Sequence, residues 1–147
     1  MAQTANFDTT EILNITCREG DTFSMTLTLK DSSGVALPLA TDRYSFYMQI
    51  KEAIRSGRTR TLEEGKVVLQ TPGLTKGEVA NAASFETPVV DDSGNVTIEA
   101  SAEVMSSLNP GSYIYDLRYV KPSDTGLDTH KTVLSGSFTI NSQITEI

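Results

Sequence analysis

Hydrophobicity repeats with a period of two along several stretches of this 147-residue chain. The clearest stretch spans residues 23–29, where phenylalanine, methionine and leucine alternate with serine and threonine. The same alternation returns at residues 44–50 and 113–119. A period of two places every second side chain on one face of a sheet, so each stretch predicts a half-buried β-strand.

Turn signals and one helix signal divide these strands. Two polar turns are predicted at residues 31–34 and 91–95, and a helix of about two turns is predicted over residues 101–108, with a serine cap at its start. Residues 51–65 lose the alternation and become charged, which indicates a long exposed loop. Residues 74–88 are expected to be irregular with at most a short strand, and they offer only Val79 and Phe85 as anchors.

Seven or eight strands with one brief helix predict an all-β fold, an immunoglobulin-like antiparallel β-sandwich. The length suits one domain. We expect an N-terminal arm at residues 1–10, the sandwich at residues 11–141 and a C-terminal tail at residues 142–147. The first strand is predicted from Leu13 to Cys17. Cys17 is the only cysteine, so it cannot form an internal disulfide and is expected to be a small buried side chain.

Charge and hydropathy argue against two classes of partner. The net charge is −7, which repels a phosphate backbone, so no nucleic-acid partner is expected. The chain has neither a signal-peptide pattern nor a run of about 20 apolar residues, so we expect synthesis in a cytosol and no membrane contact. The basic cluster is interpreted as part of a solvated loop, because acidic residues are interspersed with it. It comprises Lys51, Arg55, Arg58 and Arg60, with Glu52, Glu63 and Glu64.

The residues needed for catalysis or metal binding are scarce. His130 is the single histidine, and we expect it in an exposed loop. One histidine and one cysteine cannot form a zinc site, and no phosphate-binding glycine loop occurs. Asp91, Asp92 and Asn95 could offer oxygen atoms to calcium, although turn formation alone explains them. The sequence therefore predicts no enzyme, no cofactor and no small-molecule ligand.

The segment from Asn109 to Tyr115, which reads Asn-Pro-Gly-Ser-Tyr-Ile-Tyr, resembles the entry to strand F of immunoglobulin domains. The resemblance implies that Tyr113, two residues after Gly111, is the corner tyrosine, whose hydroxyl bonds backwards to the main chain. Tyr115 would occupy the position of the disulfide cysteine, and its presence implies a domain without that disulfide.

A wider set of landmarks resembles a domain of tailed-bacteriophage virion proteins, found at the N-terminus of baseplate upper proteins and in tail-fibre and capsid decoration modules. The landmarks lie at residues 20–34, 44–50, 94–103, 108–117 and 134–140. The resemblance implies a non-enzymatic virion component that binds other virion proteins and copies of itself. Proteins of this type usually continue into a coiled coil or receptor-binding part, whereas this sequence stops at Ile147. The position therefore stays open between a tail, baseplate or fibre adaptor and a capsid or neck decoration protein.

Two further hypotheses complete the sequence-based account. A host-surface or carbohydrate-binding adhesion module is the alternative function, with Tyr47 and Tyr119 as outward-facing aromatic candidates, although tryptophan is absent. The chain ends are the candidate interaction segments, through Phe7, Ile144 and Ile147. We expect residues 143–147 to become ordered against a neighbouring subunit, and a frayed tail is the competing interpretation.

Overall fold

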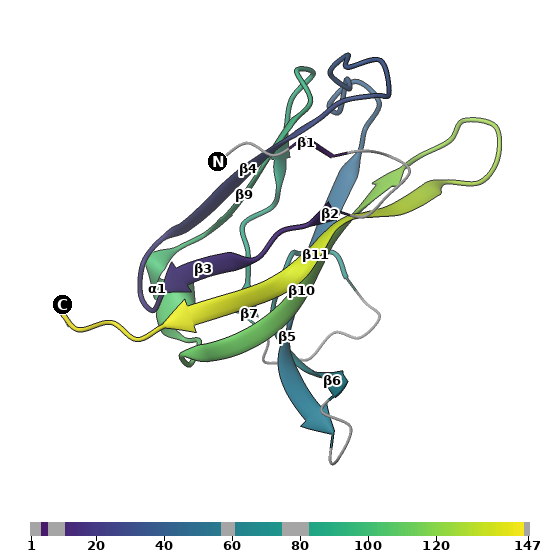
Figure 1. Cartoon of the computed structure of the whole chain (residues 1–147). Helices are drawn as coiled ribbons and strands as arrows, with labels where there is room; N and C mark the ends of the chain where they lie inside the picture. The colour runs from purple at the N-terminus through teal and green to yellow at the C-terminus, as the bar shows by residue number, and fades with distance from the viewer. Residues whose placement is uncertain (1–3, 6–10, 57–60, 75–82, 146–147) are drawn as a thin grey trace.

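The computed structural model describes residues 4–5, 11–56, 61–74 and 83–145, which form two packed β-sheets (Figure 1). The smaller sheet has the order β1-β4-β9-β8, with β1 at Thr4–Ala5, β4 at Phe23–Leu29, β9 at Asn95–Ala100 and β8 at Val89–Val90. The larger sheet has the order β2-β11-β10-β5-β6-β7, and β3 also pairs with β11. Its strands are β2 (Glu11–Ile12), β3 (Ile15–Arg18), β11 (Thr129–Asn141), β10 (Gly111–Lys121), β5 (Ser45–Ser56), β6 (Thr61–Gln70) and β7 (Ala83–Ser84).

The strand order is that of an immunoglobulin-like sandwich, which confirms the predicted fold class. Strands β4, β9 and β8 occupy the places of B, E and D, while β5, β10 and β11 occupy those of C, F and G. Strand β6 lies beside β5 where variable-type domains have C′. The short helix α1 (Ala102–Ser106) connects β9 to β10, as the helix signal predicts.

The core lies between the sheets and is formed by the inward residues of the alternating strands. Strand β4 has the predicted bounds, and all four of its predicted apolar residues are buried. Burial of such side chains is the main favourable term in folding. Phe85 is buried as one of the two expected anchors, whereas Val79 lies outside the described residues.

The predicted loop at residues 51–65 is wrong. Strand β5 continues to Ser56, and β6 begins at Thr61 and pairs with β5 in antiparallel register. The ribbon projects from the sandwich in Figure 1. Hydrophobic alternation reports a strand only where one face is buried, and a projecting ribbon can be held by backbone pairing alone. The basic residues Arg58 and Arg60 lie outside the described residues.

Several strand boundaries also differ from the predictions. The described residues contain eleven strands, of which seven have four or more residues and four have two. A two-residue strand is too short to show periodicity. The N-terminal arm contributes one of these, because β1 pairs in parallel with Thr28 and Leu29 of β4. His130 lies in β11 rather than in a loop, although its side chain is exposed as expected.

The described helix is short. None of the helices among the described residues has the length and hydropathy of a membrane-spanning segment.

Candidate interaction surface

Tyr113 stands at the corner between α1 and β10. Its ring is buried and its hydroxyl donates a hydrogen bond to the carbonyl oxygen of Asn109, four residues upstream, at 2.6 Å. The Ser101 hydroxyl caps α1 by accepting from the N–H of Val104 at 3.2 Å. The hydrogen bond of Tyr113 therefore holds the segment that follows α1 against the first residues of β10. Gly111 is exposed at the start of the same strand.

Tyr115 connects β10 to the segment between β2 and β3. Its hydroxyl donates to the carbonyl oxygen of Leu13 at 2.6 Å, and burial raises the pKa of this hydroxyl to about 12. The N–H of Ser137 donates instead to the side-chain oxygen of Asn14 at 3.1 Å. The strand predicted from Leu13 to Cys17 begins only at Ile15, as β3, and these two side-chain bonds hold Leu13 and Asn14 in the gap between β2 and β3.

Tyr113 and Tyr115 therefore face inward, and both have a structural role. Cys17 also contributes to the interior, but it is half-buried rather than fully buried. Burial and, to a smaller extent, Asp21 raise the pKa of its thiol, which favours the unreactive protonated form.

The C-terminal segment is attached to the sandwich at its root and exposed beyond it. The N–H of Glu19 donates to the carbonyl oxygen of Asn141 at 2.7 Å, and the Arg18 guanidinium donates to that of Ser142 at 2.8 Å. Two residues further along, the side chain of Ile144 is 93% exposed. The segment leaves the molecule at the end where β3 and β11 end (Figure 1). The other end residues proposed for interaction, Phe7 and Ile147, lie outside the described residues.

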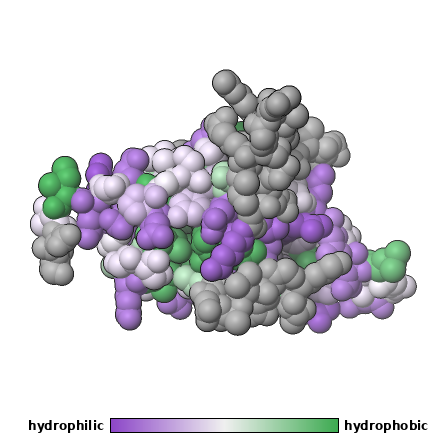
Figure 2. Space-filling model, turned by 90° about the horizontal axis from the view of Figure 1, so that it is seen from below, coloured by the Kyte–Doolittle hydropathy of each residue, from purple (hydrophilic) through white to green (hydrophobic). Residues whose placement is uncertain are grey.

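The remaining apolar surface is dispersed. In Figure 2 the described surface is largely hydrophilic, with green atoms at both extremities of the view and smaller green areas near its centre. Among the described residues, the large apolar side chains that are exposed lie in different parts of the chain. They are Ile12, Val35, Val89, Leu127 and Ile144.

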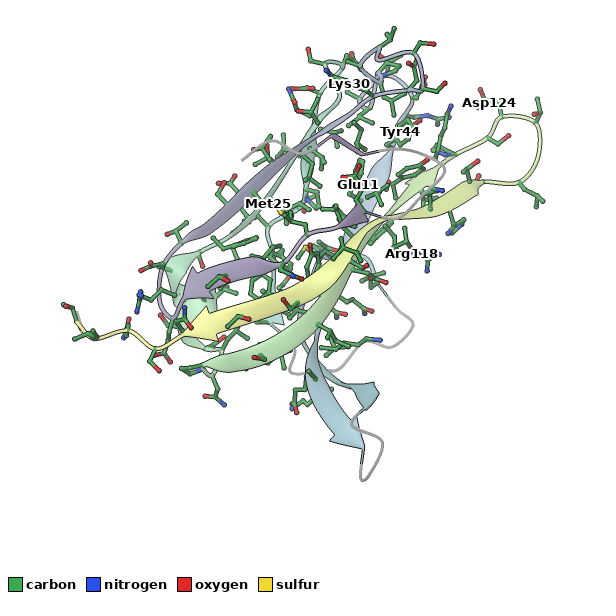
Figure 3. All side chains as sticks on the ribbon, in the orientation of Figure 1. Glu11, Met25, Lys30, Tyr44, Arg118 and Asp124 are labelled. Atoms are coloured by element: carbon green, nitrogen blue, oxygen red, sulfur yellow. The ribbon has the colours of Figure 1, made fainter. Side chains whose placement is uncertain are left out.

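A slot opens at the edge of the sandwich where β3 and β4 face each other. It has a volume of about 280 Å³ and is lined by Leu13, Asn14, Ile15, Thr16, Ser24 and Met25. Met25, which belongs to the core, is labelled on β4 in Figure 3. We call this opening the β3–β4 slot. The slot was not predicted from the sequence, because β3 and β4 belong to different sheets. The alternation of Leu13, Ile15 and Cys17 indicated only that one side of β3 is apolar.

The outer face of the larger sheet carries a second hollow of about 290 Å³, lined mainly by polar residues of β5, β10 and β11. No exposed aromatic pair accompanies it. Tyr119, expected to face outward, is only 3% exposed. Its ring meets the ring of Tyr44 edge-on, with 5.1 Å between the ring centroids. Tyr47 is half-buried. The prediction for Tyr119 is wrong because it shares the inward parity of Tyr113 and Tyr115 on β10.

The acidic turns bind their own backbone. One oxygen of Asp91 accepts from the N–H groups of Ser93 and Asn95, and the other accepts from the Asn95 amide at 3.2 Å. The hydrogen bond from the Asn95 N–H is the largest cause of the lowered pKa of Asp91. Asp31 accepts from Ser33 and Val35 in the same pattern. Among the described residues, no cluster of three or more histidine, cysteine, aspartate or glutamate side chains is placed to hold a metal ion.

Comparison with known proteins finds a likeness among solved structures. No protein-family model matches the sequence, and no curated protein matches it. Among solved structures, the chain is similar to the N-terminal domain of phage TP901-1 ORF48, with 9% sequence identity and a TM-score of 0.44. The match covers 96% of this chain and 99% of that one.

Proposed function

We propose that the chain is a non-enzymatic structural component of a bacteriophage virion that binds neighbouring virion proteins. Its place would be that of a tail, baseplate or fibre adaptor or of a capsid or neck decoration protein. The order of the sequence landmarks, which resembles that of phage virion domains, supports this proposal. The interior roles of Tyr113, Tyr115 and Tyr119 fit a rigid module whose contacts lie elsewhere on its surface.

The observation that carries the proposal is the exposed isoleucine on a segment with an anchored root. Ile144 exposes 93% of its surface, while Ser142 is held by the Arg18 guanidinium. Burying such a side chain against a partner would contribute about 1.5–3 kcal/mol. An extended segment can also gain backbone hydrogen bonds by adding to a neighbour's strand edge. The segment thus offers both apolar area and backbone groups to a neighbouring subunit.

The test is the composition of purified phage particles. We expect the chain to remain with intact particles through density-gradient purification, at a fixed copy number measured by quantitative mass spectrometry. Recovery only in the particle-free fraction, with the particles complete in their other proteins, would overturn the proposal. A chain that binds host-surface glycans in solution but is absent from particles would favour the adhesion alternative.

A further inference from the structure

We infer that the β3–β4 slot is an acceptor for the C-terminal segment, residues 142–147, of a second copy of this chain. The segment would add as a strand along the open edge of β4 and place Ile144 in the slot. This inference rests on the proposed function, because it names the partner that the exposed segment binds.

The first supporting observation is the open edge of β4. The N–H of Leu29 donates to the carbonyl oxygen of Gly94 on the β9 side at 2.7 Å. Because backbone groups alternate in direction along a strand, the amides of Ser24 and Thr26 point toward the opposite edge. Among the described residues, only β1 pairs with that edge, and it reaches only Thr28 and Leu29. The stretch beside the slot therefore presents free backbone donors and acceptors.

Strand β3 also has an open backbone edge, on the other side of the slot. The N–H groups of Leu13 and Glu19 donate to β11 residues, to the carbonyl oxygens of Ser135 and Asn141. The alternate residues Asn14 and Thr16 consequently direct their backbone toward the slot. Two strand edges with unsatisfied hydrogen-bonding capacity are a template for an added strand.

The slot has an apolar part, beside its polar residues Asn14, Thr16 and Ser24, and has room for a side chain. Leu13, Ile15 and Met25 line it, and the first two are only partly buried in the free domain. A dry cavity of about 150 Å³ suffices to hold benzene, and the slot has about 280 Å³. The slot therefore has the volume to receive an isoleucine side chain.

The C-terminal segment has the matching pattern. Phe138 and Ile140 are buried inward residues of β11, and Ile144 continues their even-numbered parity four residues later. Ile144 and Thr145 are β-branched, which suits an extended strand. With Ile144 in the slot, Gln143 and Thr145 would face the opposite side of the added strand.

The segment is directed away from the slot of its own molecule. The turn between β3 and β4 joins the two strands that line the slot, and the Gln143 side chain lies close to Gly20 in that turn. The bond from Arg18 to Ser142 fixes the root on the outside of the same turn. To enter the slot of its own molecule, the segment would have to reverse its direction. Insertion into a second copy needs no reversal. It produces a head-to-tail contact, which closes into a ring or continues as a row of copies.

Disulfide trapping in the full chain tests the contact. In a Cys17→Ser background, we would combine Ser24→Cys with Thr145→Cys, and compare Glu99→Cys with Thr145→Cys, because Ser24 is exposed on the outward side of β4 and Thr145 would face the same side of the added strand. Glu99 is exposed on β9 and lies opposite Ser24 in register. We expect at least tenfold more intermolecular disulfide for the Ser24 pair. Equal yields, or a disulfide formed only within one molecule, would overturn the inference.

Peptide binding provides a second measurement that does not depend on the introduced cysteines. A fluorescent peptide of residues 141–147 would be titrated into full-length chain carrying Ile144→Asp, with the same peptide carrying aspartate at that position as the control. We expect at least tenfold weaker binding of the control peptide. Equal binding of the two peptides, or no binding of the parent peptide, would overturn the inference.

These results separate the inference from the proposed function. If the chain is an integral part of particles but the parent peptide does not bind, the function stands and the acceptor is wrong. If the peptide binds and the chain is absent from particles, the acceptor stands and the virion function is wrong.

Discussion

At the scale of single residues, tyrosine hydroxyls hold parts of the chain that the alternating pattern alone would leave apart. Tyr113 binds the carbonyl oxygen of Asn109, and Tyr115 binds that of Leu13. A motif in the sequence indicated the backward bond of Tyr113. The partner of Tyr115 lies 102 residues away, and such a distant pairing depends on how β2 and β3 align with β11.

Replacement of the corner hydroxyl should destabilise the domain although the ring is kept. Tyr113→Phe leaves the Asn109 carbonyl without its donor, so we expect a loss of about 1–3 kcal/mol in the free energy of unfolding. Ser112→Ala, on the exposed neighbour, should change it by less than about 0.5 kcal/mol. Urea denaturation of the two variants measures the difference. Parent-like stability of Tyr113→Phe would show that Tyr113 is an ordinary packing residue.

High pH should destabilise the domain through its buried tyrosines. Burial raises the pKa of Tyr115 to about 12, and burial followed by Tyr44 raises that of Tyr119 to about 12. The unfolded chain ionises near pH 10, so these groups stabilise the fold below pH 10 and lose that contribution as the pH rises to 12. We expect the urea midpoint to fall across this window, and to fall less steeply in Tyr115→Phe. If the urea midpoint fell equally steeply with pH in the parent and in Tyr115→Phe, the raised pKa of Tyr115 would be contradicted.

The inward parity of the strands predicts a contrast between neighbouring residues. Leu27 is 2% exposed, whereas Thr26 faces outward and shares a 3.2 Å hydroxyl contact with Thr97. Leu27→Ala should cost roughly 2–5 kcal/mol, and Thr26→Ala under about 1 kcal/mol. Guanidinium unfolding monitored by circular dichroism compares the two variants. Equal losses would refute the assigned register.

At the scale of elements, a helix or strand could be predicted from the sequence where one of its faces is buried. Strand β4 was predicted to its exact bounds and α1 within the predicted helical segment, because each has an apolar side and clear end signals. The outer part of the β5–β6 ribbon, within residues 51–65, was predicted as a loop, since its pairing involves the backbone and leaves no apolar alternation to detect. The two-residue strands arise from tertiary neighbours, which a local pattern does not contain.

The two acidic turns provide a matched test at this scale. Gly34 and Gly94 both have positive φ, at 82° and 81°. A Cβ atom at Gly34 would meet nothing within 4 Å, whereas at Gly94 it would collide with the carbonyl oxygen of Leu29. Gly34→Ala should therefore cost about 1–2 kcal/mol from the left-handed conformation alone. Gly94→Ala should cost clearly more, about 3 kcal/mol or above. Thermal melts of both variants measure this, and a smaller loss for Gly94→Ala would contradict the turn geometry.

At the scale of the whole molecule, the described residues form a sandwich with an apolar core, the β3–β4 slot at its edge and a projecting C-terminal segment. The projecting segment could be proposed from the sequence, because Ile144 follows the last predicted strand with no evident partner. The β3–β4 slot could not be proposed, since it is formed where strands of two sheets meet. Long-range pairing of β3 with β11 creates one of its walls, and the residues paired there are more than 100 positions apart in the chain.

The most direct measurement of the central claim is incorporation of tail variants into phage particles. Deletion of residues 142–147, or the single change Ile144→Asp, should leave the melting temperature of the isolated chain within about 2 °C of the parent, because Ile144 contributes little buried area. Thr145→Ser, which keeps the isoleucine, serves as the control. We expect the amount of particle-bound chain, quantified after gradient purification, to fall at least tenfold for the deletion and for Ile144→Asp but not for the control. Incorporation of the deleted chain at the parent level would contradict the claim that this segment binds the chain to its neighbours.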